Sequence, residues 1–174
     1  EMIAMLTPLA DAGLLIGMHS GNHENRILKS TSIDITRLMA KILKVPYLGY
    51  AGWSLLSVNG TRYSLYSQHG TSGAMFQWTK LGSLARQAQG IGADILAQGH
   101  THACGSEAMV RLFFDPKKNR VVEAKQYLVL TGGYLAWEGK DGPSYAMAKA
   151  LPPTKLGSPK AKLYKGDKKV HFSL

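Results

Sequence analysis

The stretch Ala93-Asp-Ile-Leu-Ala-Gln-Gly-His-Thr-His102 joins a short apolar run to a pair of histidines directly behind it. The run 93–98 follows a helical pattern at 78–89, and its length favours a strand in a sheet. Gly99 and Gly105 flank the histidines and allow tight turns there. The stretch therefore predicts a layered fold in which a strand ends in a loop that carries imidazole side chains.

The first third of the chain has the pattern helix, strand, helix. Residues 1–12 are compatible with a short helix, and the apolar run 13–19 predicts a buried strand. A helical stripe of apolar residues follows Thr31, which together with Asp34 three positions later predicts a helix N-terminus. Pro46 predicts the end of that helix.

Two hairpins are predicted further along the chain. Asn59-Gly60 lies between two runs rich in aromatic and β-branched residues, which is the strongest short signal for a hairpin. The runs 106–115 and 120–131 flank Pro-Lys-Lys-Asn and predict a second hairpin. We therefore expect an α/β or α+β fold, in the form of a two-sheet sandwich flanked by helices. The final third is expected to wrap the surface, with a last strand at 168–174.

Length and charge set the domain organisation. The chain has 174 residues, 45% of them hydrophobic and 18% charged, which predicts one globular domain over 1–150 and a basic extension over 151–174 packed on or near it. The formal net charge is +10. Six lysines lie in the extension: Lys155, Lys160, Lys162, Lys165, Lys168 and Lys169. Such a cluster attracts polyanions such as nucleic acid, or it is a solvated tail, and both readings stay open.

The cysteine content and the N-terminal residues indicate in which cellular compartment the protein is expected. The single cysteine, Cys104, excludes an intrachain disulfide. The apolar start opens on Glu1 and contains Asp11 without a basic residue before it, which argues against a signal peptide. We expect a cytoplasmic protein that has no membrane contact. A chain that opens on Glu followed by Met is also expected to be a fragment of a longer protein.

Histidines follow three of the predicted strands, at 19–23, at 69 and at 100–102. Loops at strand ends are where α/β proteins place their chemistry, because the sheet holds the roots of these loops rigidly. Imidazole together with carboxamide or carboxylate oxygen suits zinc, manganese or iron. Convergence of the three strand ends therefore predicts a site for a divalent metal ion.

Other chemistries fit less well. A zinc-protease helix needs His-Glu-x-x-His, and Ile27 stands where the second histidine after His23 is required. A thiol nucleophile at Cys104 would need activation, and a small buried thiol is the plainer role. A Ser-His-Asp triad stays open, although no Gly-x-Ser-x-Gly elbow is present, and no phosphate-binding Gly-rich loop occurs. Histidines that only satisfy core hydrogen bonds are the remaining alternative.

The motifs Gly-Asn-His-Glu (21–24), Ser-Gln-His-Gly (67–70) and Gly-His-Thr-His (99–102), in this order, resemble those of the calcineurin-like metallophosphoesterases. The resemblance covers residues 13–133. It implies a metal-dependent phosphoester hydrolase, a phosphodiesterase or phosphatase, with two divalent ions. It implies four metal ligands in this chain: Asn22, His69, His100 and His102. His23 would face the scissile phosphate and protonate the leaving oxygen, Glu24 would support the loop, and Arg26 is a candidate phosphate contact.

The family's Asp-x-His and Gly-Asp motifs have no counterpart in the residues before Gly21. The chain therefore resembles the C-terminal portion of the domain, without the N-terminal strands. We expect a missing N-terminal segment or a second chain to complete the site. The alternative is a catalytically degenerate scaffold that binds polyanions such as nucleic acid.

Overall fold

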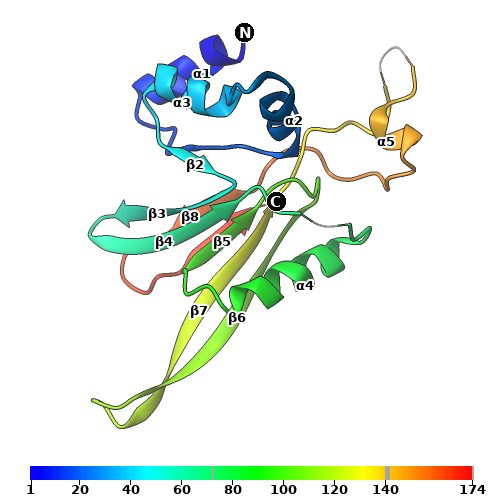
Figure 1. Ribbon diagram of the computed structural model, residues 1–174. Helices are drawn as coiled ribbons and strands as arrows, with labels where there is room; N and C mark the ends of the chain where they lie inside the picture. Colours follow the sequence, from blue (N-terminus) through cyan, green and yellow to red (C-terminus); the bar gives the residue numbers. More distant parts are fainter. Residues whose placement is uncertain (72, 140–141, 174) are drawn as a thin grey trace. The chain divides into compact units, whose positions relative to one another are not determined.

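The computed structural model describes residues 1–71, 73–139 and 142–173 (Figure 1). The chain divides into two compact units, which we call unit 1 (Glu1–Ser54) and unit 2 (Leu55–Leu174). The boundary falls inside one strand, β3 (Ala51–Val58). Within the described ranges, no helix has the length and apolar character needed to cross a membrane.

Unit 1 contains three helices and a small parallel sheet. Its elements are α1 (Met2–Asp11), β1 (Met18–His19), α2 (Asn22–Thr31), α3 (Ile35–Leu43) and β2 (Tyr47–Gly49). β1 pairs with β2 in parallel, with Met18 opposite Tyr47. The helix predicted over residues 1–12 is confirmed as α1.

The strand predicted over 13–19 is wrong in extent. Only Met18 and His19 pair with β2, and the five residues before them have no strand structure. Leu14 and Ile16 are 70% and 50% exposed, so no core formed by the described residues covers these two apolar side chains. An apolar run becomes a strand only where a neighbouring strand accepts its backbone hydrogen bonds, and here only two residues have such a neighbour.

The predicted strand-end loop at 19–26 is mostly helix. The turn consists of Ser20 and Gly21, and Asn22 is the first residue of α2. The predicted cap at Thr31 is also wrong, because Thr31 ends α2 and its hydroxyl donates to the Ile27 carbonyl at 2.7 Å. Asp34 is the N-cap of α3 instead, and its carboxylate accepts a 2.9 Å hydrogen bond from the Arg37 N–H. That hydrogen bond is the main reason why the pKa of Asp34 is lowered.

Unit 2 is built on a five-stranded mixed sheet with strand order β3-β4-β5-β7-β6. The strands are β3 (Ala51–Val58), β4 (Thr61–Gln68), β5 (Ile95–Gln98), β6 (Cys104–Asp115) and β7 (Arg120–Thr131). β5 runs parallel to both β4 and β7, whereas β6 and β7 form an antiparallel hairpin. Both predicted hairpins are confirmed, and Asn59 and Gly60 have the positive φ values, 47° and 83°, that a tight hairpin turn needs.

The described part of unit 2 contains four further elements. They are α4 (Gln77–Ala88), α5 (Tyr145–Ala148), β8 (Lys160–Leu163) and β9 (Val170–Ser173). Along β7, Leu128 and Leu130 pack with Leu84 of α4, whereas Tyr127 and Val129 belong to the cluster that includes Val170 of β9. A helix on one face and a β-hairpin on the other confirm the predicted mixed α/β sandwich (Figure 1). β8 and β9 form the last hairpin. The sequence predicted its second strand, β9, but not its first, β8.

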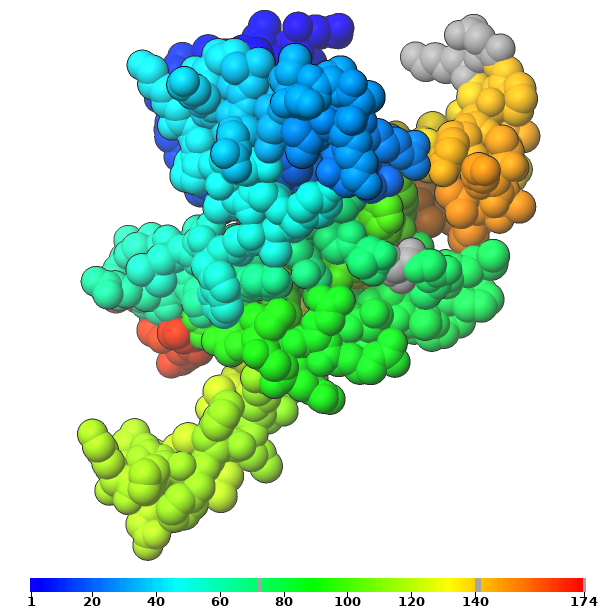
Figure 2. Space-filling view, viewed as in Figure 1, coloured from blue at the N-terminus to red at the C-terminus, as the bar shows by residue number. Residues whose placement is uncertain are grey.

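The distal part of the β6–β7 hairpin extends beyond the sheet as an arm (Figures 1 and 2). β5 pairs with β7 only between Tyr127 and Leu130, so the earlier residues of β7 pair with β6 alone. One face of this arm carries four exposed apolar side chains: Val110, Leu112, Phe114 and Val121. The arm is therefore an exposed apolar ribbon whose turn carries lysines.

Candidate metal-binding site

His69 and His100 lie at the ends of two neighbouring parallel strands. Gln68 ends β4 and Gln98 ends β5, and these residues are paired in the sheet. The Gly99 N–H donates a 3.1 Å hydrogen bond to the Gln68 carbonyl, which joins the two loops at their roots. The imidazole rings of His69 and His100 have centroids 4.7 Å apart and an interplanar angle of 53°. Parallel pairing thus brings together two histidines that are far apart in the sequence.

This ring geometry fits a shared metal ion. Two imidazoles bound at about 2.1 Å, with a right angle between their bonds, would place their ring centroids roughly 4.5 Å apart. The observed separation of 4.7 Å is close to that value. Among the described residues, no group of three His, Cys, Asp or Glu side chains could hold an ion. Within the described part of unit 2, the His69–His100 pair therefore has no third side chain of these types placed to share an ion with it.

His102 lies beside Gly133 in the loop that follows β7. A Cβ atom at Gly133 would be 2.9 Å from His102 Nδ1, so glycine is required for this approach. His100 and His102 both have left-handed backbone conformations, with φ values of 64° and 49°. Such conformations are uncommon outside glycine and cost free energy. The loop 99–102 is therefore held in a defined shape by the residues around it.

Lys80 of α4 supports this loop from beneath. Its Nζ donates a 2.8 Å hydrogen bond to the carbonyl of Thr101, between the two histidines of the loop. Lys80 is only 9% exposed, and desolvation lowers the pKa of its ammonium group. The sequence analysis did not identify Lys80, although the signal was present: Lys80, Leu84 and Ala88 share one face of α4, where a lysine interrupts an apolar stripe.

Three glutamines lie under the His69 loop. Gln68 Nε2 donates to Gln87 Oε1 at 2.7 Å and to Gln98 Oε1 at 2.9 Å. Gln98 is fully buried, and a Cβ atom at Gly70 would come within 2.3 Å of its Cγ. Gly70 also has a φ of 75°, so the backbone directly after His69 needs glycine for two independent reasons.

The candidate residues of unit 1 lie in the first turns of α2. Glu24 has a structural role there, because its carboxylate accepts a 2.8 Å hydrogen bond from the Gly21 N–H. The Gly21 carbonyl accepts a 3.3 Å hydrogen bond from the Tyr50 hydroxyl. His23 and Arg26 are exposed, and Asn22 is half-buried. Unit 1 thus presents a carboxamide and an imidazole at the start of a capped helix.

Several of the C-terminal lysines have partners inside unit 2. Lys168 Nζ lies 3.0 Å from Asp94, whose carboxylate also accepts hydrogen bonds from the N–H and hydroxyl of Ser64. Burial alone would raise the pKa of Asp94, but these hydrogen bonds and the lysine charge outweigh it, so the pKa is lowered. Lys162 and Lys169 lie over the Tyr164 ring, at 5.2 Å and 5.7 Å from its centroid. Several lysines of the basic C-terminal segment therefore make contacts within unit 2 that contribute to its folded structure.

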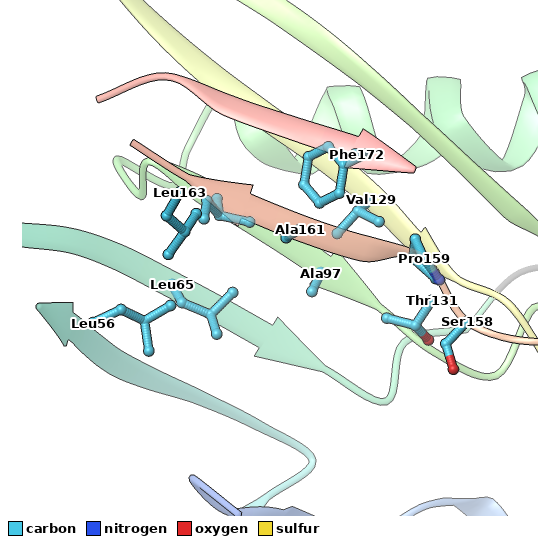
Figure 3. A pocket seen from close by; sticks show the side chains of 11 residues that line it. Leu56, Leu65, Ala97, Val129, Thr131, Ser158, Pro159, Ala161, Leu163 and Phe172 are labelled. Atoms are coloured by element: carbon cyan, nitrogen blue, oxygen red, sulfur yellow. The ribbon is translucent and has the colours of Figure 1, made fainter. Parts of the chain in front are cut away.

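A cavity of about 330 Å³ lies between the sheet and the β8–β9 hairpin (Figure 3). Its walls are mainly aliphatic and aromatic side chains, including Leu65, Val129 and Phe172. Thr131 and Ser158 are the polar residues of the lining, and no ionisable side chain faces it. This cavity belongs to the packing between the layers, and its chemistry is unlike that of the histidine pair.

No protein-family model matches the chain, and no curated protein sequence does so either. Among solved structures, a double mutant of Vps29 from Entamoeba histolytica has a TM-score of 0.39 and 12% identity, over 97% of this chain and 87% of that chain. A Thermotoga maritima protein solved by NMR has a TM-score of 0.31 and 14% identity, over 91% and 94%. Vacuolar protein sorting 29 from Cryptosporidium parvum has a TM-score of 0.27 and 18% identity, over 74% and 57%. At these TM-scores the likeness identifies neither a family nor a function for this chain.

Proposed function

We propose that this chain carries the histidine side of a metal-dependent phosphoester hydrolase, with His69 and His100 as ligands of one divalent cation. The observation that carries this proposal is the imidazole pair, 4.7 Å apart at the ends of two parallel strands. Manganese, zinc and iron are the candidate ions, because each accepts imidazole together with oxygen ligands. The full site would hold two such ions.

Asn22 and His102 are the further proposed ligands. The side chain of Asn22 would supply a carboxamide oxygen as a metal ligand, and His102 would bind the second cation. Bound cations would neutralise the phosphate oxygens and supply a nucleophile at neutral pH. His23 is exposed at the start of α2, where its imidazole is free of the core and could give a proton to the leaving oxygen.

We also propose that backbone from outside these residues, in a second chain or a longer form of this one, adds carboxylate ligands next to β1. Two observations support this. The sheet β1–β2 has only two strands, which is a marginal arrangement by itself. The apolar side chains of Leu14 and Ile16, just before β1, are 70% and 50% exposed and would be covered by an added strand.

Hydrolysis of bis-p-nitrophenyl phosphate with Mn²⁺ tests the proposal. For the protein together with the chain or segment that completes its site, we expect activity that EDTA abolishes and that Asn22→Ala lowers, whereas Asn25→Ala on the same helix serves as the matched control and retains activity. His23→Ala should lower kcat by about 10²–10⁴-fold, as expected for a general acid, while Mn²⁺ affinity is unchanged. Equal activity of the Asn22→Ala and Asn25→Ala proteins, or activity that survives EDTA, would contradict the proposed function.

A further inference from the structure

A second cavity, of about 250 Å³, adjoins the histidine loop. Its walls come from three segments of unit 2: residues within 75–80, residues 103–104 and residues 152–155. Ala103 and Cys104 directly follow His102, and Lys80 is the residue that holds the Thr101 carbonyl. The cavity therefore begins where the candidate metal-binding loop ends.

The charge of this cavity is positive. Lys80 and Lys155 line it, and none of the described residues in its lining carries a carboxylate. Lys80 is 9% exposed as a residue, and its ammonium group has the neutral Thr101 carbonyl as a hydrogen-bond acceptor. A cation in such a setting lacks a counter-charge of its own and favours an anionic ligand.

Aromatic side chains lie at the same cavity. Phe76 lines it, and its ring stacks on Trp78 with centroids 4.6 Å apart and an interplanar angle of 6°. The two residues are 54% and 70% exposed, so their rings are accessible to a ligand. Proteins that bind single-stranded nucleic acid combine this type of stacking platform with a positively charged groove.

We propose that this cavity binds one nucleoside phosphate unit, with the base on the Phe76–Trp78 stack and a phosphate oxygen near Lys80 and Lys155. The inference rests on the proposed function, because it names the substrate class of that site: phosphodiesters with a nucleoside on one side of the scissile bond. The cavity of about 250 Å³ is slightly smaller than the roughly 300–1,000 Å³ of sites for drug-sized ligands, so it would take one nucleotide unit at most, with the base on the exposed Phe76–Trp78 stack. The nucleoside phosphate belongs to a free nucleotide or to a single strand.

Binding of a fluorescent single-stranded oligothymidylate to the full chain in EDTA, followed by anisotropy, tests the inference without metal or catalysis. Phe76→Ala should weaken binding about five- to a hundred-fold, as loss of one stacking partner does. Phe114→Ala on the β6–β7 arm is the matched control, a phenylalanine that is 61% exposed, and should bind as the unchanged chain does. Trp78→Leu provides a second test if Phe76→Ala alters the circular dichroism spectrum. Lys155→Ala should reduce the salt dependence of binding, whereas Lys117→Ala in the arm should not.

Competition separates the possible ligands. Displacement of the probe by thymidine monophosphate assigns the site to free nucleotides as well, and displacement by unlabelled single strand alone assigns it to nucleic acid. Both support the inference. Displacement by poly-glutamate as efficient as by nucleotides, equal affinities of the Phe76→Ala and Phe114→Ala proteins, or no binding at all would overturn it. The nitrophenyl ester assay reports on the proposed function separately: hydrolysis without Phe76-dependent binding refutes only the inference, and Phe76-dependent binding without hydrolysis refutes only the proposed function.

Discussion

Lys80 Nζ and the Thr101 carbonyl oxygen are joined by a 2.8 Å hydrogen bond that links α4 to the loop between His100 and His102. Lys80 is 9% exposed, and desolvation lowers the pKa of its ammonium group. The bond also places an ammonium group on the wall of the smaller cavity. One residue thus supports the candidate ligands and contributes to the surface beside them.

Lys80→Met should loosen the histidine loop while the apolar stem of the side chain is kept. The Thr101 carbonyl would lose its donor, an effect of about 1–3 kcal/mol on the free energy of unfolding, offset in part by removal of a buried charge. We expect weaker Mn²⁺ binding, measured by calorimetry. Lys118→Met, at the exposed turn of the β6–β7 arm, should leave the affinity unchanged.

The same variant should change the pH dependence of stability. The pKa of Lys80 is lowered from 10.5 in the folded state, so the unfolded chain binds more protons between the two pKa values. Stability conferred by this position therefore rises with pH in that alkaline interval. Urea unfolding between neutral pH and about pH 10.5 should show the unchanged chain gaining stability relative to Lys80→Met. A constant difference across this interval would contradict the expectation.

His69→Ala should remove one of the two paired imidazoles. Even loss of a residue that only supports a metal ligand costs about 10–100-fold in affinity, so we expect at least that loss for Mn²⁺ or Zn²⁺. His171→Ala is the control, because His171 is an exposed histidine on β9 and is not among the candidate ligands. Calorimetric titration of both proteins is the measurement. Equal affinity of the two variants would show that the imidazole pair does not hold the ion.

Gly70→Ala should disturb the backbone after His69. The residue has a φ of 75°, and the new Cβ would lie 2.3 Å from Gln98 Cγ. We expect a loss of about 1–3 kcal/mol in the free energy of unfolding together with weaker metal binding. Gly73→Ala, in the same loop and with nothing within 4 Å of its Cβ position, should have almost no effect. Thermal unfolding of the two variants distinguishes these outcomes.

Asp94→Asn should destabilise the chain at neutral pH and not at strongly acidic pH. The pKa of Asp94 is lowered in the folded state, so its contribution is complete above the unfolded value near 3.8 and is lost as the pH falls through the folded value. At pH 7 the loss is expected to be about 1–3 kcal/mol, because the Ser64 N–H and Lys168 lose a charged acceptor. Unfolding by urea at neutral and acidic pH measures it. A difference that persists below both pKa values would argue against this role.

Local patterns predicted most of unit 2. The Asn59-Gly60 pair predicted its hairpin because the positive φ values of a tight turn suit these two residues. The run 127–130 reads as uninterrupted apolar residues, and these residues are indeed buried on both faces of the sheet. The errors lie in unit 1, where residues 13–17 lack a neighbouring strand and Asn22 starts a helix. Periodicity does not reveal whether a partner strand is present, and a polar segment such as 22–26 reads equally well as a loop or as an exposed helix.

The sequence by itself determined which residues stand at the ends of strands, including His69 and His100, because strand and turn propensities act over a few neighbouring residues. Only the tertiary structure decided that these two imidazoles meet, because β4 and β5 became parallel neighbours through the packing of α4 across them. It also decided that Lys80 reaches Thr101, a contact between segments that no local pattern relates. Local strand and turn propensities are compatible with several strand pairings, and long-range packing selects one of them. The candidate site depends on that selection.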